Sequence, residues 1–468
     1  MRVTEPYDVA VVGAGVVGTA VARELAGHGL RVVVVDAAAD VGEGTSKANT
    51  AILHTGFDAT PGSLESSLVR RGYALLSEYA EQAGIAVERT GALLVAWDDD
   101  QLAALPALAA KAEQNGYLRT RSVGAAELYR LEPHLGPGAL GALEVPDESI
   151  VCPWTPPLAY ATEALADGAE LLLGRRVEAV LADRDGGHEL RTTGGPVRCR
   201  WLVNAAGLYA DEVDAMLGNH DFSVIPRRGE LVVFDKLARR LVRHILLPVP
   251  TARGKGVLVA PTVFGNVLLG PTAEDLHDRT DTGSTAAGLA SLRDHGRRIM
   301  PELLAEEVTA VYAGLRAATE QPDYRIALHR AQHYVTVGGI RSTGLTASLA
   351  IAEHVAGLLG DGGLRIGERR PARPPRMPPL GEAGLRPYQR ADLIAADREY
   401  GTLVCHCERV SAGEIRDALR SPVPARTLDG LRRRTRALNG RCQGFYCGAE
   451  VRARLESGLS TGRSANPR

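Results

Sequence analysis

The sequence shows no excess of charge of either sign. Its 468 residues include 54 lysines and arginines against 56 aspartates and glutamates, which gives a formal net charge of −2. A net charge this small provides no electrostatic attraction to nucleic acid or to an anionic membrane surface. We therefore expect no nucleic-acid partner.

Long apolar runs are also missing. No stretch reaches the roughly 18 apolar residues that a membrane-spanning helix requires. The first residues, MRVTEPYDVAVVGAG, are not typical of a signal peptide, because Glu5 and Asp8 precede the apolar run. We expect a cytoplasmic protein without a transmembrane segment. Any association with a membrane would be peripheral and through a partner.

Cysteine is scarce, with six residues in the whole chain. Cys152 and Cys199 stand alone, and we expect both to be small buried side chains. The other four all lie within the last 70 residues. In a reducing compartment, cysteines grouped in this way are more often metal ligands than disulfide partners.

The grouped cysteines follow the spacing C-x-C, a gap of 34 residues, then C-x4-C, at Cys405, Cys407, Cys442 and Cys447. Four thiolates form a soft site that suits either zinc or an iron–sulfur cluster. Zinc sites more often use C-x2-C or C-x4-C on both sides. The C-x-C pair therefore favours a cluster, with structural zinc as the alternative.

A chain of this length is expected to form two or three domains. Residues 367–387 read GERRPARPPRMPPLGEAGLRP, and proline at this density does not support helix or sheet. We predict a semi-rigid linker over 367–400, a compact cysteine-bearing domain over 401–455 and a disordered tail over 456–468.

The N-terminus carries a nucleotide-binding pattern. Gly13, Gly15 and Gly18 form G-x-G-x-x-G between the valine-rich run YDVAVVG and a helical pattern, and a second apolar run ends at Asp36. These glycines permit a tight turn, close approach to a pyrophosphate and helix–strand packing. An acid at the end of the second strand can bind ribose hydroxyls. A second match, GPGALG at 136–141, has no strand before it, and we interpret it as a turn.

Three further segments have the composition of cofactor-binding loops. They are GEGTSKANTAILHTGFDATPGSL at 42–64, VNAAGLYAD at 203–211 and GGIRSTGLT at 338–346. The first is long for a strand-to-helix connection and could follow an extended FAD. Between the last two, GELVVFD, KGVLVAPTV and GNVLLGPT have strand patterns typical of an antiparallel sheet in a second lobe.

In this order, these segments resemble the D-amino-acid-oxidase-like family of FAD-dependent oxidoreductases over about residues 5–365. The similarity is strongest to the group containing the A subunit of anaerobic glycerol-3-phosphate dehydrogenase and L-2-hydroxyglutarate oxidases. GTSKANTAILHTGFD, VNAAGLYAD, RRGELVVFD, GKGVLVAPT and GLRAATE carry the resemblance. It implies an α/β fold with a Rossmann-like FAD lobe (about 1–80, 145–225 and 325–366). A mostly antiparallel substrate lobe (about 81–144 and 226–324) would cover the flavin.

The resemblance also implies site residues. Those expected to bind FAD are Gly13, Gly15, Gly18, Asp36, Thr45, Ser46, Asn49, Ala206, Gly207, Gly339, Gly344, Leu345 and Thr346. His54 has the chemistry of a general base, although a packing role is equally compatible with its position. Arg316 is expected to bind an anionic group of the substrate, and Arg341 and Lys255 are weaker candidates. Many relatives carry proline where this chain has Ala317, which weakens the transfer of a substrate from the family.

The C-terminal segment, with its GRCQGFYC motif, resembles the bacterioferritin-associated-ferredoxin-like 2Fe–2S domain, a small helical module in which the four cysteines would be the cluster ligands. We predict an FAD-dependent dehydrogenase that takes a small anionic substrate and passes electrons through the cluster to a quinone-linked acceptor or a partner subunit. Glycerol 3-phosphate, oxidised to dihydroxyacetone phosphate, is the first choice. An L-2-hydroxy acid and a secondary amine or amino acid follow. A flavin and iron–sulfur electron-transfer subunit without its own substrate is the alternative of another class.

Overall fold

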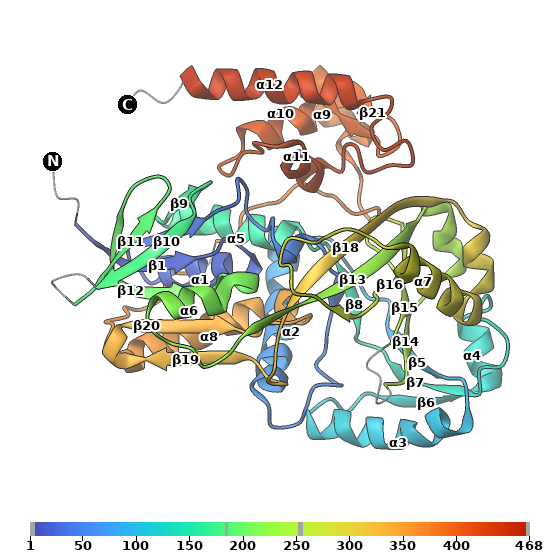
Figure 1. The fold of residues 1–468 in the computed structure, drawn as a ribbon. Coiled ribbons are helices and arrows are strands. Elements are labelled where there is room, and N and C mark those ends of the chain that lie inside the picture. The colour runs from blue at the N-terminus through green and yellow to red at the C-terminus, as the bar shows by residue number, and fades with distance from the viewer. Residues whose placement is uncertain (1–4, 183–185, 251–255, 372, 465–468) are drawn as a thin grey trace.

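The computed structural model describes residues 5–182, 186–250, 256–371 and 373–464. Two large β-sheets with their helices form the body of the molecule, and a small helical module lies on one side of it (Figure 1). The predicted fold class, an α/β nucleotide-binding lobe, a mostly antiparallel second lobe and a small C-terminal module, is confirmed.

The first sheet is mostly parallel and is built on the predicted βαβ unit. β1 (Tyr7–Val12) and β2 (Val32–Asp36) pair in parallel, and α1 (Val16–Gly27) connects them. The parallel order continues through three further strands, and three antiparallel strands complete the sheet. The parallel strands are β9 (Glu170–Leu173), β12 (Val197–Asn204) and β20 (Tyr334–Gly338), and the antiparallel ones are β10 (Val177–Ala182), β11 (His188–Thr192) and β19 (Arg325–His329).

Both faces of this sheet are buried, which explains its nearly continuous valine runs. Successive side chains of a strand point to opposite faces. Val32 and Val34 accordingly join the apolar core beneath α1, whereas Val33 and Val35 join a separate core on the other face. The helices on the α1 side are α5 (Thr155–Ala166), α8 (Gly344–Gly362) and α2 (Leu64–Ala83), and α6 (Ala210–Met216) lies against β10, β12 and β20.

The second sheet is antiparallel except where β14 pairs with β5. Its strands, in spatial order, are β17 (Glu274–Asp275), β13 (Val224–Phe234), β16 (Val267–Gly270), β15 (Leu258–Pro261), β14 (Ile245–Pro248), β5 (Ala92–Ala96), β7 (Gly141–Val145) and β6 (Arg121–Gly124). The long strand β18 (Val308–Thr319) pairs with β13 along its whole length. The surrounding helices are α3 (Asp99–Gln114), α4 (Ala125–Leu131) and α7 (Ala286–Ile299). A small third sheet contains β3 (Ile52–Leu53), β8 (Ser149–Val151) and β4 (Val87–Glu88).

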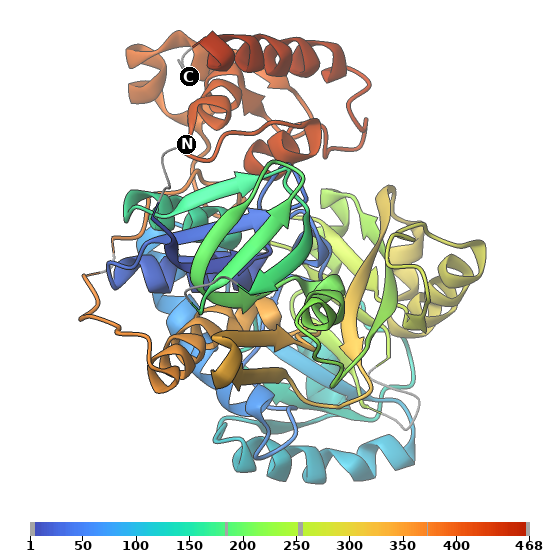
Figure 2. The same cartoon turned by 60° about the vertical axis from the view of Figure 1, so that its left-hand side comes forward.

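Residues 387–464 form what we call the cysteine module. It contains α9 (Ala391–Ala396), β21 (Leu403–Cys405), β22 (Val410–Ser411), α10 (Ala412–Arg420), α11 (Leu428–Thr435) and α12 (Gly448–Ser464) around its own apolar core. Ser411 and Glu414 cap α10 reciprocally, as their spacing predicts. A turned view shows the module on the same side of the body (Figure 2).

Two predictions about the C-terminal part are wrong. The tail predicted to be disordered over 456–468 is helical to Ser464, and 465–468 lie outside the described residues. Val451 and Leu455 anchor α12 in the module core, and tertiary packing stabilises a helix of polar composition. The predicted linker has neither helix nor strand over 367–371 and 373–386, but it contains α9 before residue 400. It also packs on the body, because the Met377 side chain is buried and its N–H donates to the Ala83 carbonyl.

The described helices include none that combines the length and the apolar character needed to cross a membrane.

Candidate functional site

The Gly-rich turn has the geometry that a bound pyrophosphate needs. Gly13 has a φ of +105°, and a Cβ there would collide with the carbonyl of Ala205 at the end of β12. A Cβ on Gly15 would approach the Ser46 hydroxyl to 3.2 Å. α1 begins at Val16 with no acidic residue in its first turn, so its N–H groups and positive dipole end face this cradle.

The other predicted cofactor residues lie at the same edge of the sheet. Asp36 ends β2, and Ala206 and Gly207 follow β12. Gly339 follows β20 with a φ of +64°. The carboxyl ends of parallel strands are where α/β sheets bind nucleotides, so these residues fit an extended dinucleotide such as FAD.

Asp36 is tied to the Gly-rich turn. Its carboxylate accepts hydrogen bonds from the N–H groups of Ala14, at 2.5 Å, and Ala38, at 2.7 Å. Burial raises the pKa of Asp36, and these two hydrogen bonds partly oppose that effect. The ribose contact predicted for Asp36 stays a prediction.

The segment 42–64 joins the turn to the start of α8. Ser46, within the 3₁₀ turn Thr45–Lys47, accepts a hydrogen bond from the Val16 N–H, at 3.0 Å. Asn49 donates to the Ser46 carbonyl and accepts from the Ala51 N–H. At its far end, the His54 N–H donates to the Thr346 hydroxyl in the first turn of α8, at 3.0 Å. Hydrogen bonds of segment 42–64 thus connect predicted cofactor residues of three loops.

His54 is held by a buried carboxylate that the sequence did not reveal. Its Nδ1 lies 3.1 Å from Oε2 of Glu148, whose side chain is fully buried. The other oxygen of Glu148 accepts hydrogen bonds from the N–H and hydroxyl of Thr55. In the tautomer whose Nδ1–H donates to Glu148, Nε2 is the nitrogen with the lone pair.

β18 brings Arg316 to the same region. Tyr312, Gly314 and Arg316 alternate along the strand and therefore share one face of the sheet. The Tyr312 hydroxyl donates to the Asn49 carbonyl at 3.1 Å, and a Cβ on Gly314 would meet Ala48. Arg316 therefore belongs to the face of β18 that covers segment 42–64.

Arg316 has the surroundings of an anion-binding residue. Among the described residues, its guanidinium makes one hydrogen bond, to the Thr272 carbonyl at 3.3 Å, and forms no ion pair with a carboxylate. Burial, together with the neighbouring charge of Arg227, lowers the pKa of Arg316. A half-buried guanidinium without a carboxylate favours binding of an anion.

The two weaker candidates are placed differently. Arg341 forms an ion pair with Glu65 of α2 at 2.7 Å and also donates to the Pro322 carbonyl, so its guanidinium is engaged within the protein. Lys255 lies outside the described residues. The role predicted for each in substrate binding stays a prediction.

The four clustered cysteines lie together at one end of the cysteine module. Cys405 ends β21 and Cys447 immediately precedes α12. The Cys407 thiol lies beside Cys442, and the Cys447 thiol lies beside Cys405. Among the described residues no three His, Cys, Asp or Glu side chains converge as a single-ion site. The paired arrangement fits a two-iron cluster, in which each iron takes two thiolates.

The surroundings shift the pKa values of two of these thiols in opposite directions. Burial raises the pKa of Cys447 to about 12, and the charge of Cys405 adds to the effect. In contrast, the N–H of Tyr446 lowers the pKa of Cys442. Gly440 packs so closely on Cys407 that a Cβ would collide with it. The other two cysteines, Cys152 and Cys199, are buried as predicted.

Sequence reasoning missed two residues of this region, Glu148 and Tyr312. Glu148 precedes β8 and contacts a histidine 94 positions away. Tyr312 lies in a strand of otherwise ordinary composition. No local pattern distinguishes either residue, because only the pairing of distant segments gives each its partner.

Two family models match this chain. The model for FAD dependent oxidoreductases matches residues 8–358, and that for the BFD-like [2Fe-2S] binding domain matches residues 403–457. The glycerol 3-phosphate dehydrogenase of Caloramator mitchellensis is 35% identical over 446 residues, covering 95% of this chain and 93% of that protein. The glycerol 3-phosphate oxidase of Mycoplasma pneumoniae is 30% identical, covering 76% of this chain and 95% of that protein.

A solved structure supports the same assignment. L-α-glycerophosphate oxidase from Mycoplasma pneumoniae with FAD bound superposes with a TM-score of 0.75 at 27% identity, covering 80% of this chain and 98% of that one. The Gly-rich cradle and the paired thiols fit the two cofactors that the family models carry. The chain is therefore an FAD-dependent enzyme of the FAD dependent oxidoreductase family, with a C-terminal BFD-like domain for a 2Fe–2S cluster.

Proposed function

We propose that this protein oxidises glycerol 3-phosphate to dihydroxyacetone phosphate and releases the electrons through its 2Fe–2S cluster. The observation that carries the proposal is Arg316, a half-buried guanidinium without a carboxylate partner in the described structure, on the face of β18 that covers segment 42–64. The names of two relatives, a glycerol 3-phosphate dehydrogenase and a glycerol 3-phosphate oxidase, support the choice of substrate.

Arg316 binds the phosphate of the substrate in this proposal. The planar fork of arginine donates two parallel hydrogen bonds to phosphate oxygens. The carbonyl of Thr272 holds one end of the guanidinium and so limits its rotation. The fixed cation would orient the substrate from the face of β18 that covers segment 42–64.

His54 accepts the proton of that alcohol through Nε2. The hydrogen bond from Nδ1 to Glu148 orients the imidazole and stabilises the charge that it gains. FAD, when bound, accepts the hydride from the carbon that carries the alcohol. The start of α8, beside His54, presents N–H groups and a positive dipole end that favour negative charge on the reduced cofactor.

The electrons then leave one at a time through the four-cysteine site to a one-electron acceptor, either a quinone-linked acceptor or a partner subunit. The match of residues 403–457 to a 2Fe–2S domain and the pairing of the four thiols support this exit.

Anaerobic mixing with candidate substrates tests the proposal. We expect glycerol 3-phosphate to bleach the flavin absorbance, with L-2-hydroxyglutarate and sarcosine, as representatives of the other two substrate classes, much slower. Glycerol without phosphate is the matched control, because it carries the same alcohol but no group for Arg316. Equal bleaching by glycerol would remove the phosphate-binding role. The absence of bleaching by every compound would favour an electron-transfer subunit without its own substrate.

A further inference from the structure

The cysteine module is joined to the body by buried ion pairs as well as by the linker. Asp40, between β2 and segment 42–64, is 1% exposed and lies against α11. Its two oxygens accept hydrogen bonds from Arg434 at 2.6 and 2.7 Å, and Arg433 donates a third at 2.8 Å. Burial by itself would raise the pKa of Asp40, but Arg434 and Arg433 hold it below its ordinary value.

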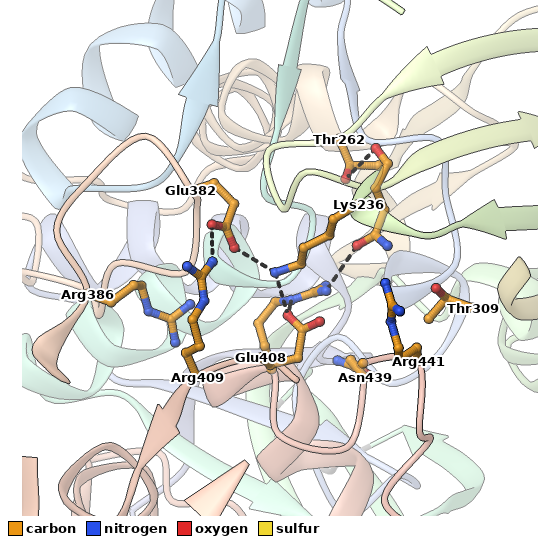
Figure 3. Close-up of polar contacts among 12 residues, drawn as sticks. Lys236, Thr262, Thr309, Glu382, Arg386, Glu408, Arg409, Asn439 and Arg441 are labelled. Atoms are coloured by element: carbon orange, nitrogen blue, oxygen red, sulfur yellow. Dashed lines mark hydrogen bonds and ion pairs between the residues drawn. The ribbon is translucent and has the colours of Figure 1, made fainter. Parts of the chain in front are cut away.

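Both cysteine-bearing loops are attached to consecutive residues of the second lobe. Glu408, next to Cys407, pairs with Lys236 at 3.1 Å. Arg441, next to Cys442, pairs with Asp235 at 2.7 Å. Figure 3 shows Lys236 between Glu408 of the module and Glu382 of the linker, with Arg441 close by. The position of the cluster site is therefore defined from two sides.

The aromatic pair of Trp154 and Phe264 lies between segment 42–64 and Glu408, the neighbour of Cys407. The Trp154 indole N–H donates to the Lys47 carbonyl at 3.1 Å, and its ring stacks on Phe264 with centroids 5.0 Å apart. The Arg436 guanidinium lies 4.1 Å from the centre of the Phe264 ring and pairs with Glu408 at 2.9 Å. A continuous series of contacts thus leads from segment 42–64 to the neighbour of Cys407.

Ion pairs as buried as these contribute little net stability, because desolvation offsets much of their attraction. Their effect on the position of the module is larger, because moving one partner away leaves the other charge buried and unpaired. Asp40, Glu408 and Arg436 are each at most 5% exposed. This burial favours one fixed position of the module over a module that swings on its linker.

We propose that Trp154, Phe264 and Arg436 are positioning residues that hold the cluster loop against segment 42–64, and that electrons pass from flavin to cluster in this docked arrangement. The inference rests on the electron exit proposed above. Each substrate supplies two electrons as a hydride. The two electrons would leave the flavin singly, with the proton of the hydride released to solvent. Each electron would reduce one ferric iron of the cluster to ferrous, and a one-electron acceptor would reoxidise that iron twice per substrate.

Docking is tested first, on the complete protein, by small-angle X-ray scattering. Asp40→Asn should enlarge the radius of gyration, because Arg433 and Arg434 lose their anionic partner. Asp429→Asn is the control, since it removes an exposed carboxylate from the same helix. If Asp40→Asn keeps the wild-type radius, the fixed docking is wrong.

The route is tested by reducing the flavin with light and EDTA and following the visible absorbance of the cluster. Phe264→Leu should keep the wild-type radius and cluster content but slow cluster reduction about tenfold, a barrier increase of about 1.4 kcal/mol. Phe445→Leu is the control, because Phe445 lies between Cys442 and Cys447 but is 84% exposed. If Phe264→Leu is no slower than Phe445→Leu, the positioning role is wrong.

A second variant covers the case in which Phe264→Leu disturbs folding. Trp154→Leu changes a half-buried ring at the other end of the stack and should slow cluster reduction similarly. Photoreduction uses no substrate, so a failure of glycerol 3-phosphate to bleach the flavin contradicts the substrate and leaves this inference standing. If the wild-type cluster is never reduced by the flavin, both the electron exit and this inference are overturned.

Discussion

At the scale of single residues, Arg316 gives the sharpest prediction. Arg316→Lys keeps a positive charge but loses the two-point fork. A hydrogen bond to a charged group is worth roughly 1.5–3 kcal/mol. We therefore expect kcat/KM for glycerol 3-phosphate to fall about 10- to 100-fold. FAD content should not change, because no described contact of Arg316 reaches the Gly-rich turn.

Arg227→Lys is the matched control for this variant. Arg227 is the cross-strand neighbour of Arg316 but is partly exposed and paired with Asp275. It should leave kcat/KM near the wild-type value. Equal losses in the two variants would show that general charge near β18, rather than a specific site at Arg316, determines the kinetics.

A second residue-scale prediction concerns the His54–Glu148 pair. A positioned base contributes about 10²–10⁴-fold, so His54→Asn should slow flavin reduction by that order while FAD stays bound. Glu148→Gln should also slow it, by a smaller factor, because the imidazole keeps a hydrogen-bond partner but loses the anion that stabilises its charge. Stopped-flow measurement of flavin reduction compares the two. If His54→Asn slows it less than fivefold, His54 is a packing residue.

At the scale of elements, the role of the turn between β1 and α1 in binding FAD can be tested by comparison with another turn that has a positive φ. Gly13→Ala should abolish FAD binding, because both its φ of +105° and the adjacent Ala205 carbonyl exclude a Cβ. Gly138→Ala is the control, since Gly138 also has a positive φ, +92°, but has open space where the Cβ would lie. The ratio of flavin to protein absorbance after gel filtration measures the outcome. Retention of FAD by Gly13→Ala would contradict the assignment of the cradle.

Local sequence patterns predicted some elements of the structure and failed to predict others. The βαβ unit, the capped start of α10 and the turn around Gly138 were predictable, because each depends on neighbouring residues alone. α9 and the end of α12 were not. Their polar sequences favour no conformation by themselves, and only packing within the module makes the helical state stable.

At the scale of the whole molecule, loss of the cluster should leave the function of the flavin lobe intact. Cys442→Ser should lose the cluster and loosen the cysteine module, since a core this small often needs a metal to stabilise it. The FAD lobe has its own extensive core and should stay folded. The variant should bleach its flavin with substrate but reduce a one-electron acceptor slowly. Wild-type protein that contained one zinc and no iron would contradict both the cluster and its role.

The docked module should also respond to acid in a defined direction. The pKa of Asp40 is lower in the folded protein than its ordinary value of 3.8. Its stabilising contribution is therefore fully present above about pH 4 and is lost as the pH falls through the lower folded-state value. Removing one partner of a buried pair costs roughly 3–5 kcal/mol.

The comparison of wild type with Asp40→Asn measures this contribution. The difference between their melting temperatures should be constant from pH 8 to pH 5 and shrink below pH 4, because protonated Asp40 resembles asparagine. A difference that is already shrinking at pH 6 would point to another group.

The sequence by itself determined the family and the two cofactors, and it predicted four thiol ligands, because these depend on glycines, cysteines and spacings that act locally. The same resemblance indicated His54 and Arg316. Only the tertiary structure decided that Glu148 holds His54, that Arg341 pairs with Glu65, and that the module is docked through Asp40. These partners are separated by 94, 276 and 394 positions. No local pattern encodes which distant charge will neutralise another, since the packing of the whole chain determines which buried groups meet.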